Sequence, residues 1–331
     1  MISLVVHVRL SVLLLVLTAV NAWLSTSARR GTEFAARCTR ATALHARQPV
    51  TDVEAALSGL NVVDIASEAS VDLEKALLEA NGPVCLVLGT YAADFNALEY
   101  AQRVSFYLPA LKAKGIDSVF FLLNASPAAS KAFKTILQMP DEVKFFSDCD
   151  GAVGRSFGVN RGWRADDAET SPYVKLFGML FGLGAMMTLP SVVGGYVGNP
   201  FSAKSTEGSW IQESMRRNQA AGLWPDTALV LSGDDKSIVQ NKFDELPLGI
   251  GQWGRRPFEL ATLRLQNMLG ISLKNWKELK PTEEELQKGL LTQLGGLLVI
   301  NKVEGRLNIK YSWIDDGICD VCNFDTALSK I

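Results

Sequence analysis

PVCLVLGTYAADFNALEYAQRV, residues 83–104, is the stretch that decides the fold. Val84–Leu88 is a short apolar run rich in branched residues, with a proline before it and Gly89 after it, which is the pattern of a buried strand. Asp94 then offers a helix N-cap, and apolar residues recur after it at helical spacing. A strand that leads into a helix N-terminus is where α/β proteins place chemistry, because the free N–H groups and the helix dipole favour a thiolate or another anion.

The segments around this stretch alternate between strand and helix patterns. Strands are predicted at 60–65, 118–123 and 143–146, and helices at 71–78, 126–139 and 151–157. Leu297–Ile300 and Leu307–Trp313 flank a Gly-containing turn and predict a β-hairpin, followed by a closing helix over Phe324–Ile331. This order predicts an α/β fold with a parallel-type sheet covered on both faces. The domain would span 53–331, with a long, mostly helical insertion at about 160–295 before the hairpin.

Composition and charge exclude several functions. The chain has 331 residues, 48% of them hydrophobic, which is ample for a sizeable core. Residues 1–50 contain six arginines and one acid, a charge of +5, so the net charge of −2 leaves −7 on the remainder. An acidic body argues against nucleic acid as a partner, because it has no basic footprint.

The positions of the histidines and cysteines exclude further catalytic mechanisms and kinds of site. Both histidines, His7 and His45, fall in the segment that we expect to be removed, so the mature chain would lack histidine for a Ser-His-Asp or Cys-His mechanism or for a metal site. Cys38 would leave with the same segment. The remaining four cysteines are too sparse for a disulfide-stapled secreted module.

The N-terminus has the composition of a two-part leader. Residues 1–22 combine a weakly basic start, an apolar core and a small-residue cleavage site, which fits a signal peptide. Residues 23–50 are rich in Ser, Thr, Ala and Arg and nearly free of acids, which is typical of a transit peptide. Together they resemble the bipartite leaders of complex plastids, so we expect a plastid location. The alternative is the secretory pathway, with a disordered N-terminal arm.

One segment of the insertion bears on membrane contact. Leu176–Gly198 is uncharged and long enough to span a bilayer, but it contains several glycines and Pro190, which would break or kink a helix. We expect a buried helix followed by a Gly-rich loop, with peripheral membrane contact as an intermediate alternative. No cofactor is predicted, because Gly249–Gly254 fits GxGxxG literally but lacks the strand that a dinucleotide site requires.

The remaining thiols are the candidate redox residues. Cys319 and Cys322 form a CxxC motif, which is a redox pair or two ordinary half-buried thiols. We expect this pair to lie after the hairpin, away from the strand-to-helix junction. Cys149 is better placed, between a strand and a helix, but its two flanking carboxylates raise a thiol pKa. Cys85, inside the central strand, is predicted to be a small core residue.

The acids at the start of the central helix offer no readable metal or base partner. Asp94 is expected to cap the helix, and Glu99 is expected to be exposed. No metal site is predicted.

Several segments, taken together, are similar to those of a known protein family. They are Leu88-Gly89, DFNALEYA at 94–101, Gly158-Val159, Thr188-Leu189-Pro190, GYVG at 195–198 and RPFELATLRLQNM at 256–268. These segments resemble the peroxiredoxin-like (AhpC/TSA-related) proteins of cyanobacteria and plastids, over roughly Leu60 to Ile331. RPFELATLRLQNM is the most specific of them.

That resemblance implies a thioredoxin-like fold and a thiol redox or antioxidant role, with a plastid thioredoxin or another thiol protein as partner. The family places its peroxidatic cysteine three positions after a threonine. Thr90 is present here, but the matching position is Ala93. Two hypotheses follow. The chain is either a redox protein that uses Cys319 and Cys322, with Cys149 as a further candidate, or a non-catalytic binding or assembly factor at the thylakoid surface.

Overall fold

The strand and the helix of the deciding stretch form at the predicted positions in the computed structural model of the chain. Strand β3 (Val84–Leu88) is buried along its whole length. Asp94 is the N-cap of helix α5 (Phe95–Ala113), and its side chain accepts a hydrogen bond from the backbone N–H of Asn96. Residues 89–93 lie between them and form the strand-to-helix junction at which the sequence analysis expected chemistry.

The structure describes residues 50, 52–197, 207–224, 228–245 and 251–331, and Val50–Ile331 forms one unit by its internal contacts. The predicted leader, with His7, His45 and Cys38, lies outside the described residues, as does the first part of the GxGxxG match.

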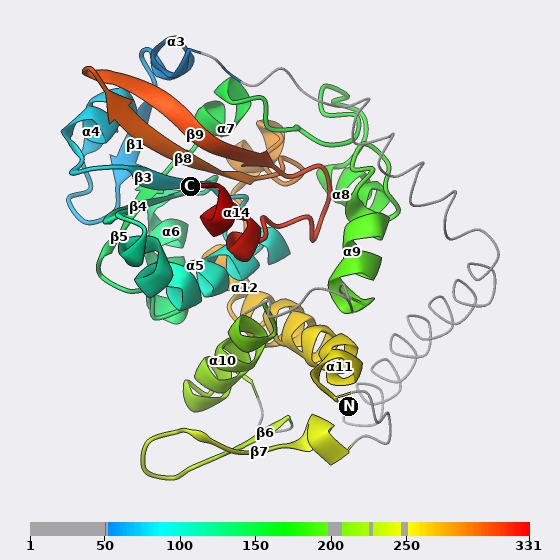
Figure 1. The fold of residues 1–331 in the computed structure, drawn as a ribbon. Coiled ribbons are helices and arrows are strands. Elements are labelled where there is room, and N and C mark those ends of the chain that lie inside the picture. The colour runs from blue at the N-terminus through cyan, green and yellow to red at the C-terminus, as the bar shows by residue number, and fades with distance from the viewer. Residues whose placement is uncertain (1–49, 51, 198–206, 225–227, 246–250) are drawn as a thin grey trace, which may run out of the picture. The chain divides into compact units, whose positions relative to one another are not determined.

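Seven strands form one mixed sheet in the order β2-β1-β5-β4-β3-β8-β9 (Figure 1). β3, β4 and β5 are mutually parallel, and the strands on both sides of them are antiparallel. The strands besides β3 are β1 (Asn61–Asp64), β2 (Ser70–Asp72), β4 (Ser118–Leu123), β5 (Val143–Ser147), β8 (Gly296–Val303) and β9 (Arg306–Ile314). The expected parallel-type sheet is therefore correct for its three central strands, and the predicted C-terminal hairpin is present as β8 and β9.

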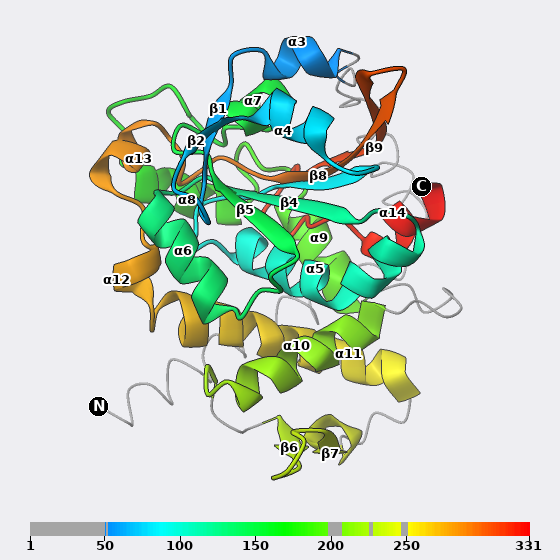
Figure 2. The same ribbon diagram turned by 90° about the vertical axis from the view of Figure 1, so that its left-hand side faces the viewer.

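Both faces of the sheet are covered, as predicted. Along β3, Leu86 belongs to one core and Val87 to the other, because successive strand residues point to opposite faces. Figure 2 shows the two layers on either side of the sheet. Helices on the first face are α3 (Val53–Leu57), α4 (Leu73–Glu79) and α7 (Ala152–Ser156). Helices on the second face are α5, α6 (Pro127–Ile136) and α14 (Phe324–Lys330).

The insertion between α7 and β8 adds further helices and a small hairpin. α10 and α11 lie beyond α5 as a further layer (Figure 2), and their apolar residues extend the core on that face. Its helices are α8 (Pro172–Leu180), α9 (Thr188–Val197), α10 (Glu207–Ala220), α11 (Gly251–Leu265), α12 (Trp276–Leu279) and α13 (Glu283–Gln287). It also contains strands β6 (Leu229–Leu231) and β7 (Ile238–Asn241), the 3₁₀ helix η1 (Lys242–Glu245) and the π-helix η2 (Gln266–Ser272). The hairpin β6–β7 was not predicted.

Two sequence predictions need correction. The predicted helix at 71–78 begins later, at Leu73, because residues 70–72 pair with β1 as β2. The segment Leu176–Gly198 is not a buried helix: its described part consists of the end of α8, the turns at 181–187 and α9, and several of its large apolar side chains are exposed. None of the helices in the described residues is long and apolar enough to cross a bilayer.

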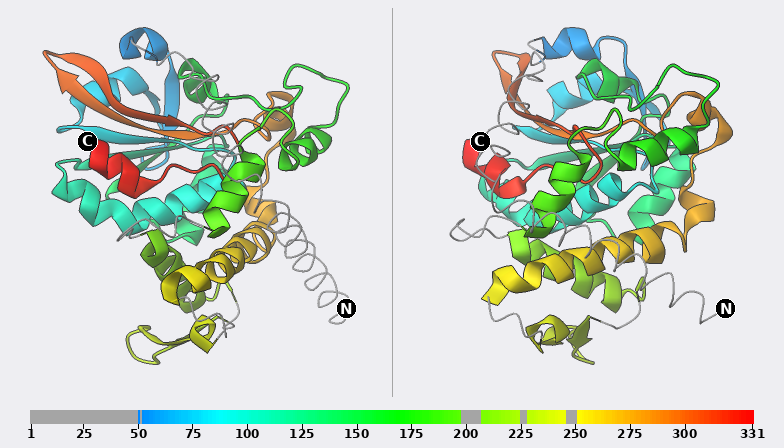
Figure 3. Two further views of the ribbon diagram at one scale, coloured as in Figure 1. Left: turned by 45° about the vertical axis from the view of Figure 1, so that its right-hand side comes forward. Right: turned by 90° about the vertical axis from the view of Figure 1, so that its right-hand side faces the viewer.

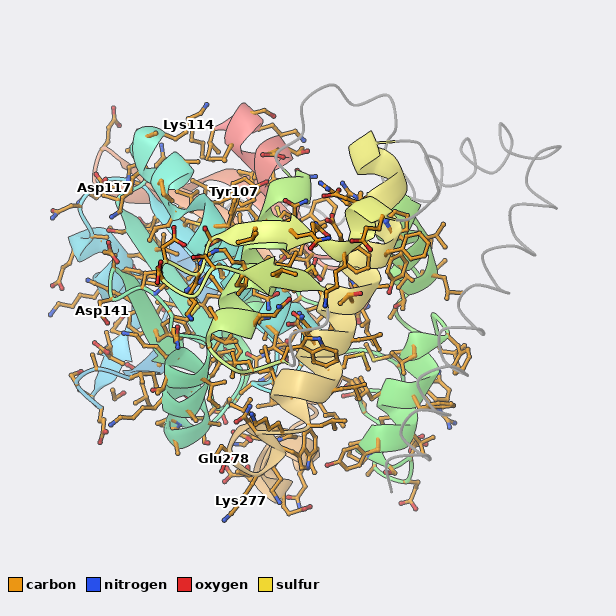
Figure 4. All side chains as sticks on the ribbon, turned by 90° about the horizontal axis from the view of Figure 1, so that it is seen from below. Tyr107, Lys114, Asp117, Asp141, Lys277 and Glu278 are labelled. Carbon is orange, nitrogen blue, oxygen red and sulfur yellow. The ribbon has the colours of Figure 1, made fainter. Side chains whose placement is uncertain are left out.

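The two edges of the parallel strands differ in character. At the amino edge, Lys114, Asp117 and Asp141 are exposed in the turns that lead into β4 and β5, and Figure 4 shows them on one side of the unit. The charges of these three residues are solvated. At the carboxyl edge, polar residues such as Asn96 and Glu99 are fully buried. The candidate site lies at that edge.

Candidate functional site

The CxxC loop, which we define as residues 315–323, packs against the first turn of α5. The backbone N–H of Cys319 donates a 2.8 Å hydrogen bond to Oδ1 of Asn96. In return, Nδ2 of Asn96 donates to Oδ2 of Asp315 at 3.1 Å and to the carbonyl of Gly317 at 3.3 Å. The expectation that the CxxC pair lies away from the strand-to-helix junction is therefore wrong. One buried amide, on the second residue of the helix, binds the loop to the junction.

A second anchor holds the base of the loop. Tyr100, one turn further along α5, donates a 2.6 Å hydrogen bond from its hydroxyl to Oδ1 of Asp315 and accepts one from the N–H of Cys322 at 3.2 Å. Trp313 Nε1 also donates to Oδ1 of Asp315, at 3.1 Å. Asp315 is fully buried, and this burial raises its pKa well above the ordinary value. Three donors on one buried carboxyl fix the loop in a single position.

Helix α9 closes the loop from the other side. The N–H of Ile318 donates to Oγ1 of Thr188 at 3.0 Å, and the Ser191 hydroxyl donates to Oδ1 of Asp320 at 2.7 Å. The fit is tight at Gly317, where an added Cβ would lie 2.2 Å from the backbone N of Thr188. The CxxC loop is therefore enclosed between α5 and α9.

The Cys319 thiol has charged neighbours of both signs. The pKa of Cys319 is raised to about 12, mainly by burial, and Glu99, Asp94 and Asp320 contribute to the increase. Arg264 acts in the opposite direction, because its positive charge favours the thiolate. The resting thiol is protonated at neutral pH.

Glu99 is the centre of a buried charge cluster. The sequence suggested exposure, but this carboxylate is fully buried. Its Oε1 accepts hydrogen bonds from Arg103, at 2.7 Å from Nη2 and 3.2 Å from Nε. Its Oε2 lies 3.6 Å from Nε of Arg264. Two guanidinium groups thus share one carboxylate, and one of them, Arg264, also acts on Cys319.

Arg264 is one of the residues at this site that sequence reasoning did not select. It is 5% exposed and lies over the rings of Phe95 and Tyr196, 5.3 and 5.0 Å from their centroids. Within the described part of the chain, its Nε and Nη1 atoms have no hydrogen-bond acceptor. The sequence could have indicated Arg264, because it lies in RPFELATLRLQNM, the most specific segment of the resemblance.

Cys322 lies deeper than Cys319. It is fully buried, and its Sγ is 3.6 Å from the hydroxyl of Tyr311. Cys85, which the sequence predicted to be a core residue, is also buried. Burial raises the pKa of the Cys85 thiol, and Cys322 makes a smaller contribution in the same direction. All four cysteines of the described residues are free thiols.

Cys149 belongs to another part of the carboxyl edge. It follows β5, and its Sγ lies 3.7 Å from the carbonyl of Ala125 and 3.9 Å from Oγ of Ser147. Burial, Glu285 and the two flanking aspartates raise its pKa. In the sheet, β5, which precedes Cys149, is two strands away from β3, which leads into α5, and two strand spacings are roughly 10 Å. The structure therefore associates Cys149 with β5 and Cys319 with the start of α5.

Position 93 lies between β3 and α5, as predicted. Ala93 is buried, and its carbonyl accepts a 2.9 Å hydrogen bond from the hydroxyl of Ser272. Thr90 donates from Oγ1 to Oδ2 of the cap residue Asp94 at 2.6 Å. Burial raises the pKa of Asp94 to about 6, partly offset by that bond from Thr90.

No group of three or more potential metal ligands occurs in the residues that the structure describes. The site therefore consists of a CxxC loop, a buried arginine and a buried carboxylate at the start of α5. In comparisons with known proteins, no family model matches this sequence, and no curated protein is significantly similar to it.

Proposed function

We propose that this protein is a peroxiredoxin-like thiol redox protein with a thioredoxin-like fold, in which Cys319 supplies the sulfur that position 93 lacks. The observation that supports this most directly is the hydrogen bond between Cys319 and Asn96, because it holds a thiol at the start of α5. The buried guanidinium of Arg264 favours the anionic form of that thiol. Cys322 is the second thiol of the pair.

The sheet supports the fold part of the proposal. Three parallel strands, β5, β4 and β3, continue into the antiparallel hairpin β8–β9, with α14 after it. That arrangement includes the C-terminal hairpin and closing helix predicted from the sequence, and it supports a thioredoxin-like fold. The insertion then supplies Arg264 and α9, which enclose the thiol.

The chemistry needs a hydroperoxide and two thiols. The Cys319 thiolate attacks the peroxide, so that an S–O bond forms, the O–O bond breaks and an alcohol or water leaves. The Cys322 thiol then attacks the resulting sulfenic acid, so that an S–S bond forms and water leaves. The two thiols supply both electrons. A dithiol partner, such as a plastid thioredoxin, restores them by disulfide exchange.

The resting protonation state sets the expected rate. Because the pKa of Cys319 is raised to about 12, the fraction of thiolate at neutral pH is small. We expect slow oxidation at pH 7 that accelerates as the pH increases. In a plastid, this would suit a protein that responds to sustained oxidation.

The test is peroxide oxidation followed by mapping of the cysteines. The full chain is treated with hydrogen peroxide, blocked with a maleimide and digested, and the peptides are identified by mass spectrometry. We expect a Cys319–Cys322 disulfide in the unmodified chain and in Cys149→Ser. Cys319→Ser should form none, and Cys322→Ser should leave a sulfenic acid at Cys319 that dimedone traps. Equal thiol loss in Cys319→Ser and in the unmodified chain would contradict the proposal.

The second candidate function is a non-catalytic binding or assembly factor at the thylakoid surface. Two observations favour it. Ala93 has no sulfur, and burial raises the pKa of Cys85, Cys149 and Cys319. A chain whose thiols survive peroxide unchanged, and which sediments with thylakoid membranes, would support this alternative.

A further inference from the structure

An exposed apolar surface lies on α8, on α9 and in the turn between them. We call it the apolar patch and define it by Tyr173, Val174, Phe177, Phe181, Met186 and Leu189. The exposed fractions of Phe177, Phe181 and Met186 are 62%, 63% and 62%. Figures 1 and 3 show α8 and α9 at one side of the sheet. With about half of each large side chain exposed, the patch presents roughly 700 Å² of surface, more than the largest patch of a typical monomer.

The patch is held in place by the residues behind it. Met179 is buried in the first core, and Gly178 packs so closely on Trp163 that an added Cβ would lie 2.6 Å from the indole ring. Because these contacts bury one side of α8, the residues that recur at helical spacing on its opposite side face outward. Phe177 and Phe181 stack edge to face there, with ring centroids 5.1 Å apart. The exposure is therefore fixed by the packing of α8.

The patch is free of exposed charge. Between Ser171 and Val197 the sole charged residue in the sequence is Lys175. Lys175 is buried, and its Nζ donates to the carbonyl of Asp167. The nearest arginines before the patch are paired, Arg161 with Asp166 and Arg164 with Asp167. An anionic lipid surface is recognised through a basic rim, and these pairs do not provide one.

The size and composition of the patch indicate its occupant. A stable protein interface buries about 800 Å² on each partner, close to the area estimated here. Interfaces between identical subunits are also more apolar than transient ones, with charges depleted at their centre. We propose that the apolar patch binds the same patch of a second copy of this chain, in a two-fold symmetric dimer.

The dimer would also act on the CxxC loop. Thr188, in the first turn of α9, accepts the hydrogen bond from Ile318, so the patch and the loop share a helix. Pairing of α9 with a second copy would fix the helix that encloses Cys319. This proposal does not depend on the redox function.

The test is the oligomeric state of the full chain, measured by light scattering after size-exclusion chromatography. We expect a dimer that Phe181→Asp converts to a monomer, without a change in the circular dichroism spectrum. Val239→Asp is the matched control, because Val239 is 67% exposed on β7, outside the patch. It should leave the dimer intact.

Two results would overturn the proposal: a monomeric chain, and a dimer that persists in Phe181→Asp. If the monomeric chain also binds neutral phosphatidylcholine vesicles through Phe181, the patch is assigned to a lipid surface. As a second measurement, Phe177→Asp should also give a monomer, which keeps the test valid if Phe181→Asp fails to fold.

Discussion

Cys319 and Asn96 are 223 positions apart in sequence, yet the backbone N–H of Cys319 lies 2.8 Å from the side-chain oxygen of Asn96. Because the same amide also donates to Asp315 and Gly317, one side chain satisfies three polar groups of the CxxC loop. Such buried groups cost free energy when they lose their partners. The position of the thiol therefore depends on a residue of the central helix.

Asn96→Ala tests this dependence. The substitution removes the acceptor of the Cys319 N–H, the donor to the carbonyl of Gly317 and one of the three donors to Asp315, so we expect a loss of about 1–3 kcal/mol in the free energy of unfolding. We also expect faster alkylation of Cys319 by a maleimide, because the loop is released. Urea unfolding and labelling kinetics measure the two effects.

Asn308→Ala is the matched control for that substitution. Asn308 is exposed on β9, and its amide bonds only locally, to the carbonyl of Arg306. It should change neither quantity appreciably. Unchanged labelling of Cys319 in Asn96→Ala would show that the hydrogen bond does not hold the loop.

Asp94 makes stability depend on pH in a defined direction. Its pKa is raised from 3.8 to about 6 by burial, so between these values the folded state keeps a proton that the unfolded state has lost. Stability from this group is therefore complete below pH 4 and is lost as the pH increases through 6. Asp94→Asn keeps a good N-cap without the charge. We expect the free energy of unfolding of this variant, relative to that of the unmodified chain, to increase from pH 4 to pH 7 by at most about 3 kcal/mol.

The change in stability with pH that Asp235→Asn causes should have the opposite sign. The pKa of the exposed Asp235 is lowered, mainly by the backbone hydrogen bond from Ser237. Its contribution is present above its ordinary pKa and is lost as the pH decreases. Urea unfolding at pH 4, 5, 6 and 7 separates the two variants. A constant difference between Asp94→Asn and the unmodified chain across this range would exclude the burial of a charged Asp94.

Local pattern was sufficient for most of the sheet. Val84–Leu88 and Ser118–Leu123 are apolar runs with clear boundaries, and both are strands with those limits. Asp94 caps α5 as predicted, and Ser126 caps the helix that was predicted to begin at 126. These features depend on neighbours in the sequence, so the sequence alone could indicate them.

The site depended on contacts that have no local signal. Glu99 looked like a surface acid, but its helical face is covered by Arg264 from the insertion, far along the chain. The CxxC loop looked remote from the junction, but Asn96 and Tyr100 bring it back to α5. The apolar residues of 176–198 suggested a buried helix. Hydropathy could not reveal that the packing surface of α8 is the narrow face around Gly178 and Met179.

Gly317→Ala should separate α9 from the CxxC loop. An added Cβ would lie 2.2 Å from the N of Thr188 and 2.5 Å from the carbonyl carbon of Met187, and backbone atoms cannot yield as a flexible side chain can. Overpacking of this kind costs about 1–3 kcal/mol. We expect a lower melting temperature and faster labelling of Cys319. Gly233→Ala is the control, because nothing lies within 4 Å of the added Cβ, and wild-type stability in Gly317→Ala would contradict the close packing.

Gln266→Met should stabilise the protein, which is unusual for a core substitution. Gln266 opens the π-helix η2 and is fully buried, and among the described residues neither its Oε1 nor its Nε2 has a hydrogen-bond partner. An unpaired buried amide costs about 1–3 kcal/mol, and methionine has nearly the same volume without the polar atoms. We therefore expect the free energy of unfolding, measured by urea unfolding, to increase by about 1–2 kcal/mol. Gln287→Met, at an exposed position at the end of α13, should be neutral. Destabilisation by Gln266→Met would instead mean that the amide is bound to a buried water, since the substitution would then remove real hydrogen bonds.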